Sequence, residues 1–284
     1  MVPVGWAVGH YYARSLERQL GARYSRDSDG IIIGARDIAR AGSNGAAVML
    51  VHGAGDTPQT MWHLADELER RGYAVEAPLL PGHGRTLAAL SMYSADDWYA
   101  CVRDHYSRLR ESHAWVGVVG LSMGGALCAQ LAGATPDVPA LVLASPYLAM
   151  PRVADIMTRT SWLWGLLVPY VPTASQESVL DPSARSHGLS YGAMSTSALR
   201  ALRTTARRGW QALPEINAPT LILQSTRDNR VDSDTTRRAY DHLSVREKEV
   251  VWIEGAGHVI TVDFGWERVV SVIADWMDSH RTGG

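Results

Sequence analysis

The sequence predicts an α/β fold, with a mostly parallel central sheet flanked by helices and a cap insertion. Three observations point to this fold. Short apolar runs alternate with helical patterns along most of the 284 residues, as expected when helices connect parallel strands. One apolar run, 116–121, meets a Gly-x-Ser-x-Gly motif and passes directly into a helical pattern, which is typical of a sharp turn from strand to helix. The alternation stops between 146 and 194, where we expect the insertion.

The repeating pattern assigns most of the chain to strands or helices. The predicted strands are 46–51, 73–77, 115–119, 140–144, 220–224 and 249–253. The predicted helices are 59–71, 95–110, 124–132, 233–242 and 265–280. Residues 31–35 would add an antiparallel edge strand. A further helix over 195–208 carries Arg200, Arg203, Arg207 and Arg208, which we interpret as a solvated face.

Length and composition indicate a single α/β domain with an insertion. With 46% hydrophobic residues, the chain can bury a substantial core. Its formal net charge is -2, with acids and bases interspersed, so it offers nucleic acid no general attraction. Cys101 and Cys128 both fall in predicted helices, and no disulfide framework is implied. A cytoplasmic protein is therefore expected.

The first 30 residues form a segment of their own. Residues 2–12 are apolar and aromatic, and four arginines follow: Arg14, Arg18, Arg23 and Arg26. We expect an amphipathic helix over 1–30 that packs on the body. Contact with a lipid surface, or the end of a truncated membrane span, are the alternatives. The core would then comprise 31–145 and 196–284.

The insertion over 146–195 is rich in aromatic residues and proline and is interpreted as a cap. Its run 162–168 is too short to cross a bilayer and suits a lid over an apolar acyl pocket. Trp162, Trp164, Leu167 and, outside the cap, Val259 are the candidate substrate-binding residues. Packing of the insertion onto the body is the alternative role for these side chains.

Ser122 is the candidate nucleophile, because it stands at the centre of the Gly-x-Ser-x-Gly motif. Glycines on either side of such a serine let the backbone turn without side-chain clashes. A serine hydroxyl is a poor nucleophile until a base removes its proton. The motif alone is weak evidence, so a histidine, an orienting acid and an oxyanion site are required elsewhere.

His258 and Asp228 complete the predicted triad. His258 follows the last predicted strand in a glycine-rich loop, and an imidazole can accept and return the serine proton near neutral pH. Asp228 lies in the loop that leaves strand 220–224 and would orient His258. Asp232 and Asp234 are the competitors, but they open the next helix, where carboxylates commonly cap N-termini.

The oxyanion hole is predicted from two backbone amides. One belongs to Met123, directly after the nucleophile, and the other to Ala54 in the glycine-rich loop 52–56. His52 is expected to hold this loop. Asp56 and Gln59 are interpreted as loop and helix-start residues.

Other motifs do not indicate a metal or a cofactor. His83 lies between two glycines, but no partner ligands occur at a suitable spacing. The sequence contains no His-Glu-x-x-His, paired Cys-x-x-Cys or Gly-x-x-x-x-Gly-Lys-Ser/Thr motif. We therefore predict chemistry without metal or cofactor.

Taken together, these motifs resemble the α/β-hydrolase superfamily, in particular bacterial carboxylesterases and monoacylglycerol lipases. The resemblance spans about 46–277 and rests on the Ser122 motif, the His52 loop, the 80–84 turn, the Asp228 loop and the segment 257–263. It implies hydrolysis of a small-molecule ester, of short to medium acyl chain, through an acyl-enzyme on Ser122. The cap sequence and the N-terminal segment depart from the family pattern.

Two alternative functions are compatible with the same residues. The same triad would also serve amides, thioesters or polymeric esters. A catalytically silent binding protein on the same fold is the other alternative, although all three triad positions are filled.

Overall fold

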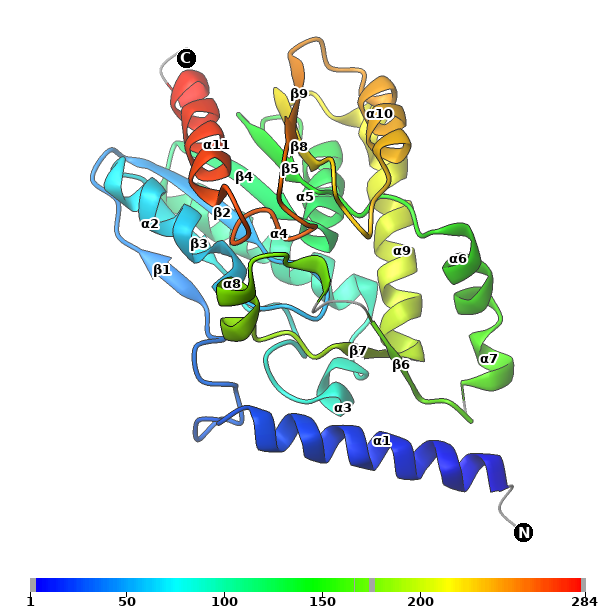
Figure 1. Ribbon diagram of the computed structural model, residues 1–284. Coiled ribbons are helices and arrows are strands. Elements are labelled where there is room, and N and C mark those ends of the chain that lie inside the picture. The colour runs from blue at the N-terminus through cyan, green and yellow to red at the C-terminus, as the bar shows by residue number, and fades with distance from the viewer. Residues whose placement is uncertain (1–3, 166, 174–176, 282–284) are drawn as a thin grey trace.

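The computed structural model describes residues 4–165, 167–173 and 177–281, shown in Figure 1. Seven strands form the central sheet in the order β1-β3-β2-β4-β5-β8-β9. Their bounds are Ile38–Arg40 (β1), Ala46–Val51 (β2), Ala74–Ala77 (β3), Trp115–Leu121 (β4), Leu141–Ala144 (β5), Thr220–Ser225 (β8) and Lys248–Ile253 (β9). Only β1 pairs antiparallel, and the other neighbours are parallel. The predicted mostly parallel sheet is thus confirmed.

The edge strand was predicted in the wrong place. β1 begins at Ile38, whereas 31–35 forms a turn with one isolated bridge between Ile32 and Arg26 of the preceding segment. Gly34 adopts a positive φ of 89°, which ends any extended run. Ile32 is buried all the same, and its N–H donates to the carbonyl of Gly84. The apolar residues in 31–35 are therefore explained by burial within a turn and not by a strand.

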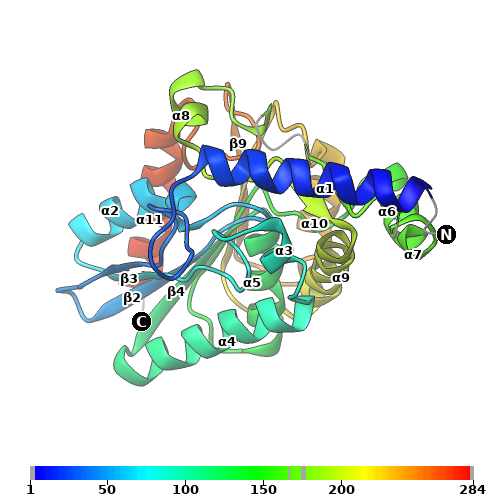
Figure 2. The same ribbon diagram turned by 90° about the horizontal axis from the view of Figure 1, so that it is seen from below.

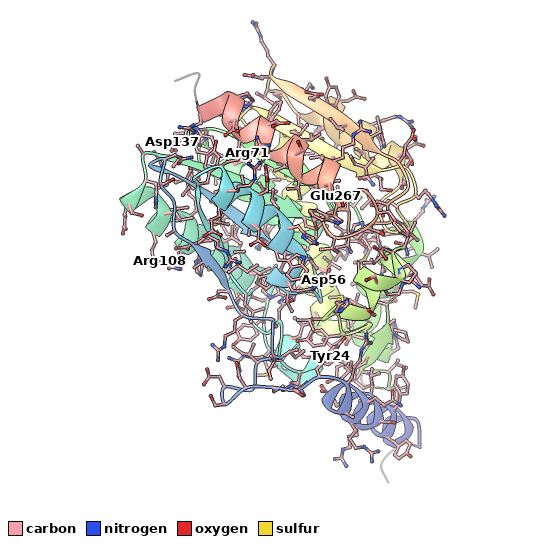
Figure 3. All side chains as sticks on the ribbon, turned by 60° about the vertical axis from the view of Figure 1, so that its left-hand side comes forward. Tyr24, Asp56, Arg71, Arg108, Asp137 and Glu267 are labelled. Carbon is pink, nitrogen blue, oxygen red and sulfur yellow. The ribbon has the colours of Figure 1, made fainter. Side chains whose placement is uncertain are left out.

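Helices cover both faces of the sheet. α2 (Trp62–Arg70) and α11 (Trp266–Arg281) pack side by side on one face, where Arg71, just after α2, pairs with Asp275 and Asp278 of α11 (Figure 3). α4 (Ala95–Ser112) and α5 (Met123–Ala134) cover the other face, with α9 (Thr196–Ala212) against α5 and α10 (Ser233–His242) at the far edge. The strands between them are buried on both sides, which explains their continuous apolar sequences.

Short helices and turns link these layers. They are the 3₁₀ turns Pro58–Met61 and Leu213–Glu215, and the one-turn helix α3 (Leu87–Leu90). Several helices begin at a side-chain cap, and the capping box of Ser94 with Asp97 starts α4.

Residues between β5 and α9 form the inserted region. It contains α6 (Arg152–Arg159), α7 (Ser161–Trp164), α8 (Pro182–His187) and a two-stranded antiparallel sheet, β6 (Tyr170–Pro172) with β7 (Ala193–Ser195). Figure 1 shows α6 and α7 beside α9, and β6 and β7 near α3.

The arginines of α9 form only part of the solvated face that the sequence predicted, because Arg203 and Arg200 also contact the inserted region. Arg203 donates to Asp155 of α6 at 2.5 Å, and Arg200 donates to Ser161 of α7 at 2.9 Å. Arg208 pairs with Asp96 of α4, and Arg200 and Arg207 are exposed. Because the inserted region folds back over α9, this face becomes a connection between the insertion and the core.

The N-terminal helix α1 (Val4–Arg23) lies across the molecule beside α3 and the inserted region (Figure 2). Ala13 and Leu20 are buried, and Glu17 accepts the N–H of Ala88 and the hydroxyl of Tyr170. At Gly9 a side chain would meet the carbonyl of Leu167. Residues 1–3 of the segment 1–30 lie outside the described residues. Within the described ranges, no helix is both long and apolar enough to cross a membrane.

Candidate active site

Ser122 occupies a strained turn between β4 and α5. Its φ of 54° and ψ of -116° are uncommon for a residue with a side chain. The flanking glycines make the turn possible: a Cβ on Gly120 would lie 2.3 Å from the Gly124 carbonyl oxygen, and one on Gly124 would lie 2.1 Å from that of Val51. The Ser122 hydroxyl therefore stands at the carboxyl end of the sheet with its backbone fixed.

His258 contacts this hydroxyl, and Asp228 contacts the other nitrogen of the His258 ring. Nε2 of His258 lies 2.8 Å from Oγ of Ser122, and Nδ1 lies 2.8 Å from Oδ2 of Asp228. With Nδ1 protonated, the ring donates to the carboxylate and Nε2 accepts from the serine. The structure thus brings the three predicted residues together, although 136 positions separate Ser122 from His258.

The Asp228 side chain is almost fully enclosed. Burial raises its pKa, but the charge and the hydrogen bond of His258, with the backbone N–H groups of Val231 and Arg230, hold the pKa below its usual value. The amide of Gln224 also donates to Oδ2, at 2.8 Å. Asp228 is accordingly an anion that can fix the tautomer of His258 and stabilise its charged form.

The two competing acids have other roles. Asp232 is the N-cap of α10, where its carboxylate accepts the N–H of Thr235 at 2.6 Å. Asp234 pairs with Arg237 on the same helix. Neither has a hydrogen bond to His258, whereas Asp228 does.

The glycine-rich loop after β2 lies against the nucleophile. A Cβ on Gly53 would come within 3.3 Å of the Cβ of Ser122, and Ala54 lines the same cavity as Ser122 and His258. Met123 begins α5, so its N–H is one of the unpaired amides at a helix N-terminus. Both predicted oxyanion donors are therefore next to the serine.

His52 and His83 are structural. Nε2 of His52 accepts the N–H of Leu80 at 3.0 Å, and Nδ1 donates to the Gly53 carbonyl. Burial lowers the pKa of His52 well below its ordinary value and that of His83 to about 4. Both rings are therefore neutral at physiological pH. The described residues contain no cluster of side chains that could hold a metal ion.

The cavity beside Ser122 has a volume of about 280 Å³. Its walls are mostly apolar and come from the inserted region and α9: Tyr147, Met150, Pro151, Ala154, Met157, Trp164, Val171, Met194, Leu199 and Leu202. Asn229 and Arg230 add a polar end. The volume lies just below the range of about 300 to 1,000 Å³ that is usual for small-molecule sites.

Only one of the four predicted substrate-binding residues lines this cavity. Trp164 does so, whereas Trp162 is 71% exposed and Leu167 is 42% exposed. Val259 lines a separate small pocket with Asp56 and Thr57. The sequence prediction missed the wall residues because the insertion consists of short elements without a clear period, in which neighbours such as Trp162 and Trp164 face opposite ways.

The sequence did not indicate a role for Asp263, which anchors the loop that contains His258. Its fully buried carboxylate accepts the N–H groups of Gly257, Leu180, Asp181 and Phe264 at 2.6 to 2.8 Å. Gly257 directly precedes His258. Asp263 therefore connects the loop that contains His258 to Leu180 and Asp181 of the inserted region.

Comparison with known protein families and sequences identifies relatives over most of the chain. The family model described as "Serine aminopeptidase, S33" matches residues 42–264. The thermostable monoacylglycerol lipase of Bacillus sp. (strain H-257) is 29% identical over 233 residues, which cover 82% of this chain and 90% of the relative. The carboxylesterase of Bacillus subtilis (strain 168) is 24% identical over 218 residues, covering 76% and 86%.

Solved structures agree on the fold. A metagenome-derived lipolytic enzyme superimposes with a TM-score of 0.82 at 27% identity, covering 88% of this chain and all of that chain. The monoacylglycerol lipase of Paleococcus ferrophilus gives a TM-score of 0.74 at 23% identity, with coverage of 86% and 98%. The sheet order and the helices on both faces are thus shared with known lipolytic enzymes.

Proposed function

Because this chain belongs to the serine aminopeptidase S33 family and has the α/β-hydrolase fold, we propose that it is a serine carboxylesterase. Its substrates would be carboxylic esters of short to medium acyl chain, including monoacylglycerols. Relatives described as a monoacylglycerol lipase and a carboxylesterase support ester hydrolysis. The single observation that carries the catalytic assignment is the Ser122–His258–Asp228 chain of hydrogen bonds.

The geometry supports the following sequence of steps. Oγ of Ser122 attacks the ester carbonyl while Nε2 of His258 takes its proton. The N–H groups of Ala54 and Met123 stabilise the resulting oxyanion. His258 then returns the proton to the departing alcohol, leaving an acyl-enzyme on Ser122. Water, deprotonated by His258, releases the acid and restores the serine.

Amide hydrolysis at a free amino terminus is the second reading, since the family description names aminopeptidases. Such a substrate carries a protonated amine, which calls for a carboxylate on the wall of the site. The described lining of the cavity includes an arginine and no carboxylate. The cavity therefore favours esters over amino-terminal peptides.

Residues 146–195 act in this proposal as a cap over the acyl site. The inserted region supplies most of the apolar wall, including Met150, Met157 and Trp164. An acyl chain held there would be removed from water, which favours binding by about 0.8 kcal/mol per buried CH₂.

We also propose that the enzyme contacts a lipid surface through the inserted region and α1. Large apolar side chains are exposed together over 153–168: Val153, Ile156, Met157, Trp162, Leu163, Leu167 and Val168. Tyr11 of α1 is 70% exposed, and Gly9 of that helix touches Leu167. Arg152 and Arg159 are exposed and form no ion pair with a described residue, so the surface suits anionic lipid.

The test of ester hydrolysis is turnover of p-nitrophenyl esters from acetate to palmitate, and of monoacylglycerols, with Ser122→Ala alongside. We expect turnover with a short or medium length optimum, reduced by at least about 10³-fold in the variant. Retained activity in a folded Ser122→Ala protein would remove Ser122 from the mechanism. Absence of turnover on every ester would favour an amide, a thioester or a binding role.

A further inference from the structure

The polar end of the active-site cavity carries one fixed positive charge. Arg230 lines the cavity with Ser122 and His258, and no carboxylate is among the described lining residues. We propose that Arg230 binds an anionic group on the alcohol part of the substrate, so that the enzyme prefers esters whose alcohol bears a carboxylate or phosphate. This inference rests on the proposed ester hydrolysis.

The backbone of Arg230 is fixed by the triad acid. Its N–H donates to Oδ1 of Asp228 at 2.7 Å, while Oδ2 of the same carboxylate accepts from His258. The side chain is held as well, because Nε donates to Oγ of Ser178 at 3.0 Å. Ser178 also donates to Oδ1 of Asn229. Nη1 and Nη2 are left without a hydrogen bond to any described residue, and are available to a ligand.

Some partly buried arginines have carboxylate partners, and Arg26 and Arg85 donate from their outer nitrogens to backbone carbonyls; the outer nitrogens of Arg230 have neither kind of partner in the described part of the chain. Arg71 contacts Glu67, Asp275 and Asp278, and Arg203 contacts Asp155. Arg230 forms no ion pair within the described residues. A guanidinium in a confined site is stabilised by a charge-paired hydrogen-bond acceptor, and its planar fork matches a carboxylate or phosphate. The missing acceptor is therefore expected on the substrate.

Asp56 is the nearby acid that has to be considered as a partner. The charges of Arg230 and His258 lower the pKa of Asp56, but burial dominates and raises it to about 6. Asp56 lines the separate small pocket, away from the cavity wall. Arg230 therefore acts on Asp56 through space and keeps its outer nitrogens for another anion.

The position of Arg230 selects the alcohol side of the ester. The amides of Ala54 and Met123 hold the carbonyl oxygen in the proposed mechanism, whereas Nε2 of His258 gives its proton to the leaving oxygen. Arg230 belongs to the loop that contains Asp228, the partner of His258. Because an acyl chain would take the apolar wall of the cavity, the polar lining residues Asn229 and Arg230 are left for the alcohol part.

Matched aryl butyrates test the proposal. 4-Carboxyphenyl butyrate and 4-carbamoylphenyl butyrate differ by one charge at nearly equal size, and 4-phosphonophenyl butyrate separates a preference for phosphate-like groups from one for carboxylate. The readout is the ratio of kcat/KM for the anionic ester to that for the carbamoyl ester. Wild type is compared with Arg230→Met, Arg230→Lys and the control Arg227→Met, which removes an exposed arginine from the same loop.

We expect Arg230→Met to lower this ratio by about ten- to a hundredfold, the usual range for a hydrogen bond to a charged group. Arg230→Lys should keep part of the preference, and Arg227→Met should keep the wild-type ratio. Added salt should also reduce the wild-type ratio, a check that needs no variant. An equal ratio in wild type and Arg230→Met would overturn the proposal. If wild type hydrolyses none of the esters, the proposed function itself fails, and this inference with it.

Discussion

At the scale of single residues, the identity of the triad acid is the sharpest assignment to test. Asp228→Asn places an amide beside Nδ1 of His258 and favours the wrong tautomer, so kcat should fall by about 10³–10⁴-fold. Asp232→Asn is the matched control, because asparagine also caps helices and Asp232 caps α10. Steady-state kinetics with p-nitrophenyl butyrate would decide. The assignment is wrong if the Asp232 variant loses activity and the Asp228 variant keeps it.

A second prediction for a single residue concerns how Asp56 affects stability at different pH values. Burial raises its folded pKa to about 6, above the value of about 3.9 for an unfolded chain. Its contribution to stability is present below the unfolded pKa and is lost as pH rises through 6. At pH 8 the native state holds a desolvated charge, so Asp56→Asn should raise the free energy of unfolding by about 1–3 kcal/mol.

The check is urea unfolding of wild type and Asp56→Asn between pH 8 and pH 4. The gain in the variant should shrink steadily as the pH falls towards 4. A difference between the two proteins that does not change over this interval would contradict the raised pKa.

The three residues of the proposed triad could be predicted to lie together because each one follows a strand. Parallel strands present their carboxyl ends at one edge, so Ser122 after β4, Asp228 after β8 and His258 after β9 had to lie close together. Arg230 also follows β8, two positions beyond Asp228. The sequence did not predict a binding role for it, because that role depends on its place in the cavity wall. Asp263 gave no signal, because its role depends on backbone N–H groups from a distant segment.

At the scale of elements, the inserted region makes a prediction about acyl-chain length. Trp164 lines the cavity, while Trp162 on the same short helix α7 faces solvent. Trp164→Ala would enlarge the acyl site, so we expect longer chains to gain relative to acetate by about tenfold in kcat/KM. Trp162→Ala is the control and should leave the profile unchanged. A series of p-nitrophenyl esters measures both, and equal profiles for all three proteins would mean that Trp164 only packs the insertion.

Helices and strands with a regular hydrophobic pattern could be predicted from the sequence, and irregular elements could not. The buried strands and the long helices α4, α10 and α11 follow the patterns read from the sequence. The edge strand was displaced to β1 because glycines with positive φ turn the chain at 30 and 34. The contacts of Arg200 and Arg203 of α9 with α6 and α7 were not predicted, because α6 and α7 belong to the part of the chain without a repeating pattern.

At the scale of the whole molecule, the exposed apolar surface over 153–168 predicts binding to lipid. The replacements Trp162→Glu and Leu163→Glu put negative charge in this surface, which should weaken binding to vesicles of equimolar phosphatidylcholine and phosphatidylglycerol by at least about tenfold. Ile33→Glu is the matched control, since Ile33 is also exposed but lies outside 153–168. Co-sedimentation gives the bound fraction. Equal binding by wild type and the double variant would leave the surface without this role.

The overall architecture also explains why hydrolysis can be assigned ahead of the substrate. The family model matches residues 42–264, the inserted region included; within this range Ser122, Asp228 and His258 follow strands of the central sheet, whereas most of the cavity wall comes from the insertion and α9. In the proposed mechanism the loops after the core strands supply the catalytic groups and the charge of Arg230, and the insertion supplies most of the apolar wall.

The most direct test of the account is the acyl-enzyme itself. We would mix wild type with p-nitrophenyl butyrate, quench in acid within the first turnover, and measure the intact protein and its peptides by mass spectrometry, with Ser122→Ala in parallel. The account predicts a mass increase of one butyryl group on the peptide that contains Ser122, and none in the variant. Ester cleavage with no covalent adduct on Ser122, or with an adduct on another residue, would contradict it.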